Sequence, residues 1–128
     1  YMNNFVISIP NKGRCVISGR NYALDELVEE TNVIVLPKEN LLNINSTILE
    51  KYYFEWFDED GAILTGNGLL YNHWGDPNLK LIADREKLKM KFIATKPVQR
   101  GDELVFDYGY IIENAVKPIS NYFNKITR

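Results

Sequence analysis

The stretch GLLYNHWGDPN, residues 68–78, is the part of the sequence that most restricts the fold. It holds the chain's only histidine, a tryptophan, a proline and three amide or acid side chains, all directly after an apolar run. A strand usually ends in a simple turn built from one or two turn-forming residues. So many side chains able to hydrogen-bond to the backbone are unusual in one short segment. We therefore ask which fold requires them there.

Length and composition favour one globular domain over residues 1–128. The chain has 128 residues, of which 45% are hydrophobic, and a chain of this size buries roughly two-thirds of its unfolded surface. The sequence contains no internal repeat, no low-complexity tract and no linker-like segment. A second domain would therefore have no room.

Charge and cysteine content exclude several classes of function. A formal net charge of -2 argues against direct binding of nucleic acid, because such proteins usually carry a basic excess. The single cysteine, Cys15, can form neither an intrachain disulfide nor a cysteine-based zinc site, and it favours a reducing compartment. The chain has no apolar run of about 18 residues and no signal-peptide pattern, so no association with a membrane is expected.

Short apolar segments separated by glycine and by Asp or Asn turns indicate a protein made mostly of strands. In REKLKMKFIA, residues 85–94, three lysines alternate with three apolar side chains, which is the period of two expected when one face of a strand is solvated. Further strands are expected at residues 5–9, 31–37, 79–83 and 104–108. The sequence thus predicts a mainly β fold with few helices.

Two helices are predicted. The segment STILEKYYFEWF, residues 46–57, offers Ser46 or Thr47 as an N-cap before a mixed periodic stretch. At the C-terminus, apolar residues recur on one helical face over roughly residues 112–126, with Pro118 at a kink or a first turn. We expect this second helix to pack over the edge of the domain.

Four segments in order resemble the SET domain of protein lysine methyltransferases. The likeness is closest to the small viral SET proteins, which also lack zinc-binding flanks, and it spans about residues 12–110. It implies a SET fold of several small sheets with a knot-like C-terminal crossing, in which the Asn-His segment and the Asp-Tyr-Gly segment pass one another. The segments are KGRC (12–15), LDELVEE (24–30), GNGLLYNHWGDPN (66–78) and ATKPVQRGDELVFDYGY (94–110).

The resemblance answers the question raised by residues 68–78. Irregular backbone buried at the crossing must find a partner for every N–H and C=O group, and Asn72, Asp76 and Asn78 could supply them. The resemblance also implies S-adenosylmethionine as the cofactor, bound beside the crossing. The implied cofactor-binding residues are Gly13, Arg14, Cys15, Asn72, His73 and Tyr108.

The sequence departs from the family pattern at three places. Gly13-Arg14-Cys15 stands where the family usually has Gly-x-Gly, Trp74 stands where it has serine, and Gly75 replaces a cysteine that binds zinc in other members. No metal is therefore expected. The first two changes leave open an alternative function, in which these side chains obstruct the cofactor pocket and the chain is a catalytically inactive SET-like module that binds a basic protein segment.

Methyl transfer from a sulfonium to a lysine needs positioning of an uncharged amine, which a narrow aromatic channel favours. The resemblance assigns Tyr108 to the catalytic position, where the hydroxyl orients the amine, since a phenol with a pKa of about 10 is a poor base at neutral pH. His73 is not expected to act as a general base, nor Cys15 as a nucleophile. The predicted channel residues are Tyr52 (or, less favoured by register, Tyr53), Phe106 and Tyr110.

The resemblance implies a protein substrate with a basic segment, with a histone tail favoured and a ribosomal or other basic protein as the alternative. An acidic cluster could attract such a segment or simply be a solvated face; its members are Glu55, Asp58, Glu59 and Asp60. Tyr122 and Phe123 could cover the adenine or only pack the C-terminal helix. A homodimer is possible by analogy with the viral relatives, and a nuclear location would follow only from a histone substrate.

Overall fold

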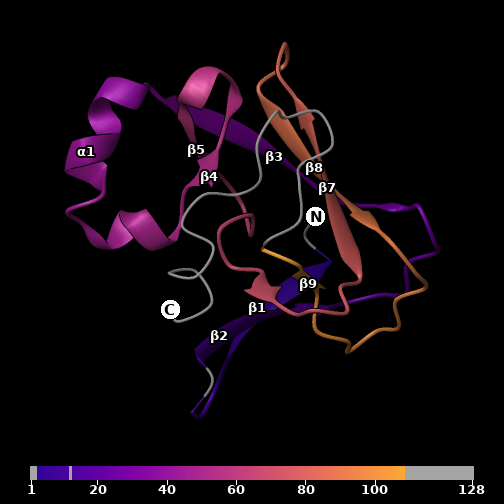
Figure 1. The fold of residues 1–128 in the computed structure, drawn as a ribbon. Helices are drawn as coiled ribbons and strands as arrows, with labels where there is room; N and C mark the ends of the chain where they lie inside the picture. The colour runs from indigo at the N-terminus through magenta and orange to yellow at the C-terminus, as the bar shows by residue number, and fades with distance from the viewer. Residues whose placement is uncertain (1–2, 12, 109–128) are drawn as a thin grey trace.

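A computed structural model of the chain describes residues 3–11 and 13–108, and it consists mainly of short strands (Figure 1). The helical elements are α1 (Leu41–Ile44) and three short 3-10 helices, η1 (Lys38–Asn40), η2 (Ile48–Lys51) and η3 (Phe57–Glu59). The strands are β1 (Asn4–Ile9), β2 (Gly13–Ser18), β3 (Leu27–Leu36), β4 (Phe54–Glu55), β5 (Gly61–Leu64), β6 (Asn72–His73), β7 (Leu79–Asp84), β8 (Lys89–Ala94) and β9 (Val105–Phe106).

The strands form three sheets in the described part of the chain. The largest is antiparallel, with five strands in the order β4-β5-β3-β8-β7. Strands β1 and β2 form an antiparallel hairpin, which extends away from that sheet in Figure 1, and β6 and β9 form a parallel pair. The predicted fold class, mainly β with several small sheets and few helices, is confirmed.

Strands β7 and β8 show why the sequence folds as a sheet. Their side chains alternate strictly between buried and half-buried positions, so one face of the pair packs into the core and the other meets solvent. The period of two expected for residues 85–94 holds from Lys89 onward, but Lys87 and Leu88 lie in the turn before β8. The buried residues of the pair are Leu79, Leu81, Ala83, Met90, Phe92 and Ala94.

The helix predicted for residues 46–57 is wrong in length. Only η2 forms there, and the Thr47 Oγ1 accepts a hydrogen bond from the Leu49 N–H at 3.2 Å, so Thr47 is the N-cap. The chain then turns into β4, where Phe54 is buried and pairs with β5. Burial of this aromatic residue in the sheet overrides the weak helical pattern.

One predicted helix lies outside the described residues, and one observed helix was not predicted. The C-terminal helix at residues 112–126, with Tyr122 and Phe123, lies outside them. Helix α1 was not predicted, and its Leu41 lies close to Gly61 of β5. No helix in the described ranges is long and apolar enough to span a membrane.

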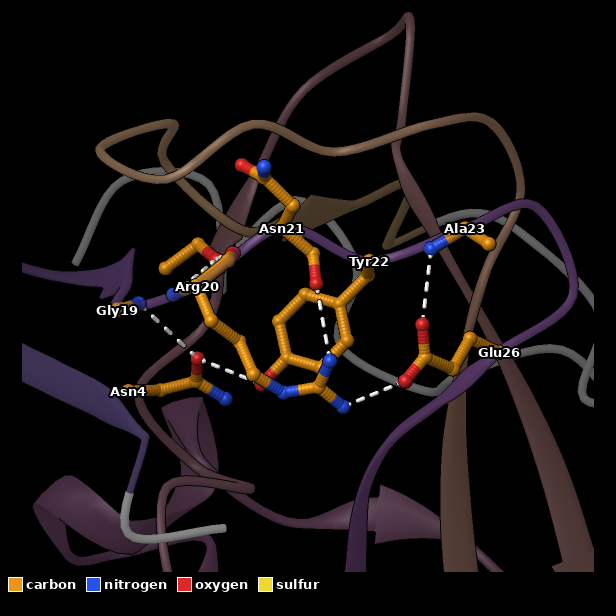
Figure 2. A network of polar contacts seen from close by, with 8 residues as sticks. Asn4, Gly19, Arg20, Asn21, Tyr22, Ala23 and Glu26 are labelled. Atoms are coloured by element: carbon orange, nitrogen blue, oxygen red, sulfur yellow. Dashed lines mark hydrogen bonds and ion pairs between the residues drawn. The ribbon is translucent and has the colours of Figure 1, made fainter.

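A network of polar contacts stabilises the loop between β2 and β3 (Figure 2). The Tyr22 hydroxyl donates to Asn4 Oδ1 at 2.9 Å, and the Arg20 guanidinium lies 4.0 Å from the centre of the Tyr22 ring. Arg20 also pairs with Glu26 at 2.5 Å, while Glu26 accepts a hydrogen bond from the Ala23 N–H. We call this set the corner network: Asn4, Ser18, Gly19, Arg20, Asn21, Tyr22, Ala23 and Glu26.

Candidate active site

The parallel pair β6–β9 brings two distant segments side by side. Asn72 lies opposite Val105 and His73 opposite Phe106, and the Trp74 N–H donates to the Phe106 carbonyl at 3.2 Å. The two segments predicted to meet therefore lie side by side as a strand pair. We call residues 72–78 together with residues 103–108 the crossing.

Asn78 binds the two segments of the crossing together. Its Nδ2 donates to the Glu103 carbonyl at 2.9 Å and its Oδ1 accepts from the Val105 N–H at 2.9 Å, so one buried amide satisfies two backbone groups. The role predicted for Asn78 is confirmed. Asp76 does not act this way, because its exposed carboxylate forms an ion pair with Lys96 at 3.1 Å.

Asn72 links the crossing to the start of β2. Its Nδ2 donates to the Arg14 carbonyl at 2.8 Å and to Glu103 Oε2 at 3.0 Å. The neighbouring Leu104 N–H donates to the Val16 carbonyl at 2.8 Å. The start of β2, the Asn-His segment and the approach to β9 therefore meet at one place.

The three residues at the start of β2 lie in different environments. Gly13 has φ of +95°, a left-handed conformation that favours glycine, and Arg14 is exposed. Cys15 is fully buried, and an added Cβ at Gly13 would meet nothing within 4 Å. The cysteine side chain therefore does not occupy the space beside Gly13.

Tyr108 is buried at the crossing, and both its hydroxyl and its backbone N–H form hydrogen bonds. Its hydroxyl donates to the Tyr71 carbonyl at 2.7 Å, and its N–H donates to His73 Nδ1 at 3.0 Å. Because His73 Nδ1 accepts a hydrogen bond, the ring proton of a neutral His73 is assigned to Nε2. The 3.7 Å approach of Asp107 to the same nitrogen is then a contact between two acceptors rather than a hydrogen bond.

Aromatic rings surround Tyr108. The Phe106 ring centre lies 4.9 Å from that of Tyr108, and the His73 ring centre lies at 5.3 Å. The predicted channel residue Phe106 is thus adjacent to the predicted catalytic tyrosine. Tyr53 is buried and donates to Asn45 Oδ1 at 2.9 Å.

Tyr52 and Tyr110 are the two other predicted channel residues. Tyr52 is half-buried at the end of η2, with its N–H donating to the Leu49 carbonyl at 2.9 Å. Its place in the channel stays a prediction. Tyr110 lies outside the described residues.

The sequence interpretation missed a buried pair beneath Tyr108. The Tyr71 hydroxyl donates to Glu29 Oε1, and Glu29 Oε2 accepts the Asn67 N–H at 3.0 Å. Burial, followed by the charge of Glu29 and the hydrogen bond to it, holds the pKa of Tyr71 well above its ordinary value. Glu29, Thr31 and Val33 are buried residues of β3, but apolar and polar residues do not alternate around Glu29 in the sequence, so no local signal marked it as buried.

A hollow of about 590 Å³ lies beside the crossing. His73, Trp74 and Val105 give it aromatic and apolar walls, and the acidic side chains of Asp102 and Glu103 border it. The Trp74 side chain is prominently exposed, at 63%. Trp74 therefore stands at the wall of the hollow and does not fill it.

Two carboxylates of the predicted acidic cluster bind groups near η3. Asp58 forms an ion pair with Arg85, and Asp60 Oδ1 accepts a hydrogen bond from the Lys38 N–H at 2.9 Å. These two carboxylates therefore stabilise the surface around η3. Within the ranges that the structure describes, no group of His, Cys, Asp and Glu side chains could hold a metal ion.

Comparisons with known proteins agree with the geometry. A family model described as the SET domain matches residues 5–109. A Plasmodium falciparum protein named as a candidate histone methyltransferase matches with a TM-score of 0.64 and 22% identity, over 84% of this chain and 97% of the other. CpSET8 from Cryptosporidium matches with a TM-score of 0.65 and 25% identity, over 88% of this chain and 59% of that chain. The search of curated proteins gave no match.

Proposed function

This chain belongs to the SET domain family, and we propose that it is an S-adenosylmethionine-dependent methyltransferase that acts on a lysine side chain of a protein. The observation that carries the proposal is the meeting of three segments at the crossing. Asn72 contacts the Arg14 carbonyl, and His73 binds the backbone of Tyr108. All of these residues were singled out by the sequence motifs.

The residues present fit the cofactor. When bound, S-adenosylmethionine supplies an electrophilic methyl group for an in-line displacement. An added Cβ at Gly13 would meet nothing within 4 Å, so open space lies beside residues 13–15, which by the resemblance wrap the methionine and ribose portions of the cofactor. Gly13, Arg14, Cys15, Asn72 and His73 would hold the cofactor, with Tyr108 lying at the reacting end.

Tyr108 is proposed to orient the lysine amine. Its only hydroxyl proton is directed to the Tyr71 carbonyl, so toward any other group the phenol oxygen can act only as an acceptor. An acceptor at this position can fix an amine through its N–H group, and the buried aromatic surroundings disfavour the charged ammonium form. Phe106 would line the same channel, together with Tyr52 and Tyr110.

The substrate is proposed to be a protein with a basic segment, with a histone tail favoured. The formal net charge of -2 and the acidic cluster support attraction of such a segment, and no nucleic acid or membrane partner is proposed. The alternative of an inactive binding module needs side chains that obstruct the cofactor site. Cys15 is buried and Trp74 stands at the wall of the hollow, so the enzyme is favoured.

A second copy of the chain is a possible partner within this proposal. The hairpin β1–β2 presents several large apolar side chains to solvent, and such a patch favours association. Sedimentation of the purified protein would test it, since a strictly monomeric protein at high concentration would exclude the dimer. The exposed residues are Phe5, Val6, Ile7 and Ile9.

The Tyr108→Phe variant tests the function. We expect transfer to core histones, or to proteins of a cell lysate, to fall by about 100-fold or more, the size seen when one positioned polar group is lost from an active site. Cofactor affinity measured by calorimetry should stay close to that of the wild type. Tyr22→Phe, which removes a hydroxyl from the corner network, is the matched control and should retain activity.

Three outcomes would contradict this proposal. Unchanged turnover of Tyr108→Phe would remove the tyrosine from the mechanism. A wild-type protein that binds no S-adenosylmethionine and labels no protein in mass spectrometry would leave only the binding module. Methylation of a basic protein other than a histone would retain the enzyme and correct its substrate.

A further inference from the structure

The exposed indole of Trp74 is the least expected feature beside the crossing. The chain has two tryptophans; Trp56 is 5% exposed and packs against the Phe57 ring at 5.1 Å, whereas Trp74 is 63% exposed. Exposure of a large aromatic surface forgoes the free energy of its burial. An indole held at the wall of a hollow can recover that free energy when a flat ligand covers it.

The hollow has the size and chemistry of a nucleoside site. Its volume of about 590 Å³ lies within the roughly 300–1,000 Å³ typical of sites for small molecules. Trp74, His73 and Val105 offer a stacking surface, and the carboxylates of Asp102 and Glu103 can accept hydrogen bonds from ribose hydroxyls or an exocyclic amine. The combination suits an aromatic base attached to a sugar.

The hollow lies next to residues that the resemblance assigns to the cofactor. Glu103 lines the hollow and also accepts a hydrogen bond from Asn72, whose amide reaches the Arg14 carbonyl beside Gly13. A ligand with an amino-acid end and a nucleoside end could therefore extend across Asn72. Its base would lie in the hollow.

We propose that Trp74 stacks on the adenine ring of the bound cofactor and that this hollow is the nucleoside half of the cofactor site. The inference rests on the proposed function. The serine that the family has at this position lacks an aromatic face, so the substitution adds a contact that the common pattern does not provide. Trp74 then strengthens cofactor binding instead of obstructing it.

A basic side chain of a protein is the competing ligand, because tryptophan and carboxylates also suit a cation. The groups already present in the hollow favour the nucleoside. Asp76 is paired with Lys96 at 3.1 Å, and Asp102 and Glu103 each accept an N–H group, from Gln99 and Asn72. Lys96 also lines the hollow and would repel a basic side chain, whereas the indole of Trp74 is exposed for stacking.

Tryptophan emission reports on the stack directly. S-adenosylhomocysteine, which carries the same nucleoside, is titrated into the wild type, Trp74→Phe and Trp74→Ala, with affinity measured in parallel by calorimetry. We expect quenching of wild-type emission that saturates with binding, and no change in Trp74→Phe, where only buried Trp56 emits. Base stacking on an aromatic side chain implies that Trp74→Ala binds about 5- to 150-fold more weakly, with Trp74→Phe much closer to the wild type.

The outcomes separate this inference from the proposed function. Wild-type protein that binds S-adenosylhomocysteine with unchanged emission, and equal affinity in Trp74→Ala, would overturn the stack and leave the methyltransferase standing. Quenching by a lysine-rich peptide but not by S-adenosylhomocysteine would also overturn it. Absence of any binding to the wild type would overturn the proposed function, and the inference with it. Leu42→Ala, at an exposed site on α1, is the control for nonspecific effects.

Discussion

The corner network and the crossing both use side-chain amides and carboxylates to bind backbone groups, but they differ in sequence separation and in burial. In the corner network, Arg20 and Glu26 are six residues apart, and their side chains are 41% and 36% exposed. In the crossing, Asn78 reaches groups 25 and 27 residues away and is 7% exposed. Water can replace the partners of the first network but not those of the second.

The difference predicts where stability and function depend on a single residue. A hydrogen bond contributes little net free energy when water can take its place, whereas a buried group left without its partner costs its full desolvation. Substitutions in the crossing should therefore be severe, and substitutions in the exposed part of the corner network should be mild. The crossing also positions Tyr108, so damage there should reach the proposed activity.

Asn78→Ala should produce the largest effect. Its removal leaves the buried Glu103 carbonyl and Val105 N–H without the partners that Asn78 supplies. At roughly 1–3 kcal/mol for each of the two groups, the free energy of unfolding should fall by about 2–6 kcal/mol. Urea denaturation followed by circular dichroism measures this change.

The matched control is Asn40→Ala. Asn40 is exposed and its side chain makes no capping hydrogen bond to α1, so its loss should change the free energy of unfolding by less than about 0.5 kcal/mol. If Asn78→Ala were as mild as this control, the crossing would not be the buried network described above.

The crossing was predictable from the sequence because its polar residues are concentrated in two short motifs. Asn72, Asn78 and Tyr108 lie where those motifs suggested. The corner network was not predictable. Arg20 and Glu26 have ordinary spacing, and only the antiparallel pairing of β1 with β2 brings Asn4 within reach of Tyr22.

The sequence analysis also missed the burial of Glu29 and predicted a helix that does not form at full length. Glu29 was taken as part of a motif and not as a buried acid, since a carboxylate is rarely buried without a partner and its partner Tyr71 is 42 residues away. The helix expected at residues 46–57 was lost to the pairing of β4 with β5. Both depend on contacts between distant residues, which local periodicity does not contain.

Tyr71→Phe should have an intermediate effect at neutral pH. The variant removes the hydroxyl that donates to buried Glu29, and a hydrogen bond to a charged group contributes about 1.5–3 kcal/mol. The free energy of unfolding should fall by that amount.

The same variant should also change how the free energy of unfolding falls with rising pH in alkaline solution. In the unfolded chain a tyrosine ionises near pH 10, whereas the raised pKa of Tyr71 keeps it protonated in the folded state. The stabilisation is therefore complete below about pH 10 and is lost above it, at up to about 1.4 kcal/mol per pH unit. Denaturation between about pH 9 and 11 should show a shallower decline for Tyr71→Phe; parallel curves would contradict this assignment.

Glu26→Gln should have the smallest effect and should depend on pH in the opposite direction. The hydrogen bond from the Ala23 N–H, and then the contact with Arg20, lowers the pKa of Glu26. The contribution of its carboxylate is therefore complete above the ordinary glutamate pKa of about 4.3 and is lost as the pH falls through the lowered value. The gap between wild type and variant should be small at neutral pH, shrink with added salt and close in acid. If the difference in the free energy of unfolding persisted in acid, the glutamine side chain of the variant would be disturbing the geometry of the corner network. The exposed charge pair of Arg20 and Glu26 would then not govern the stability of this network.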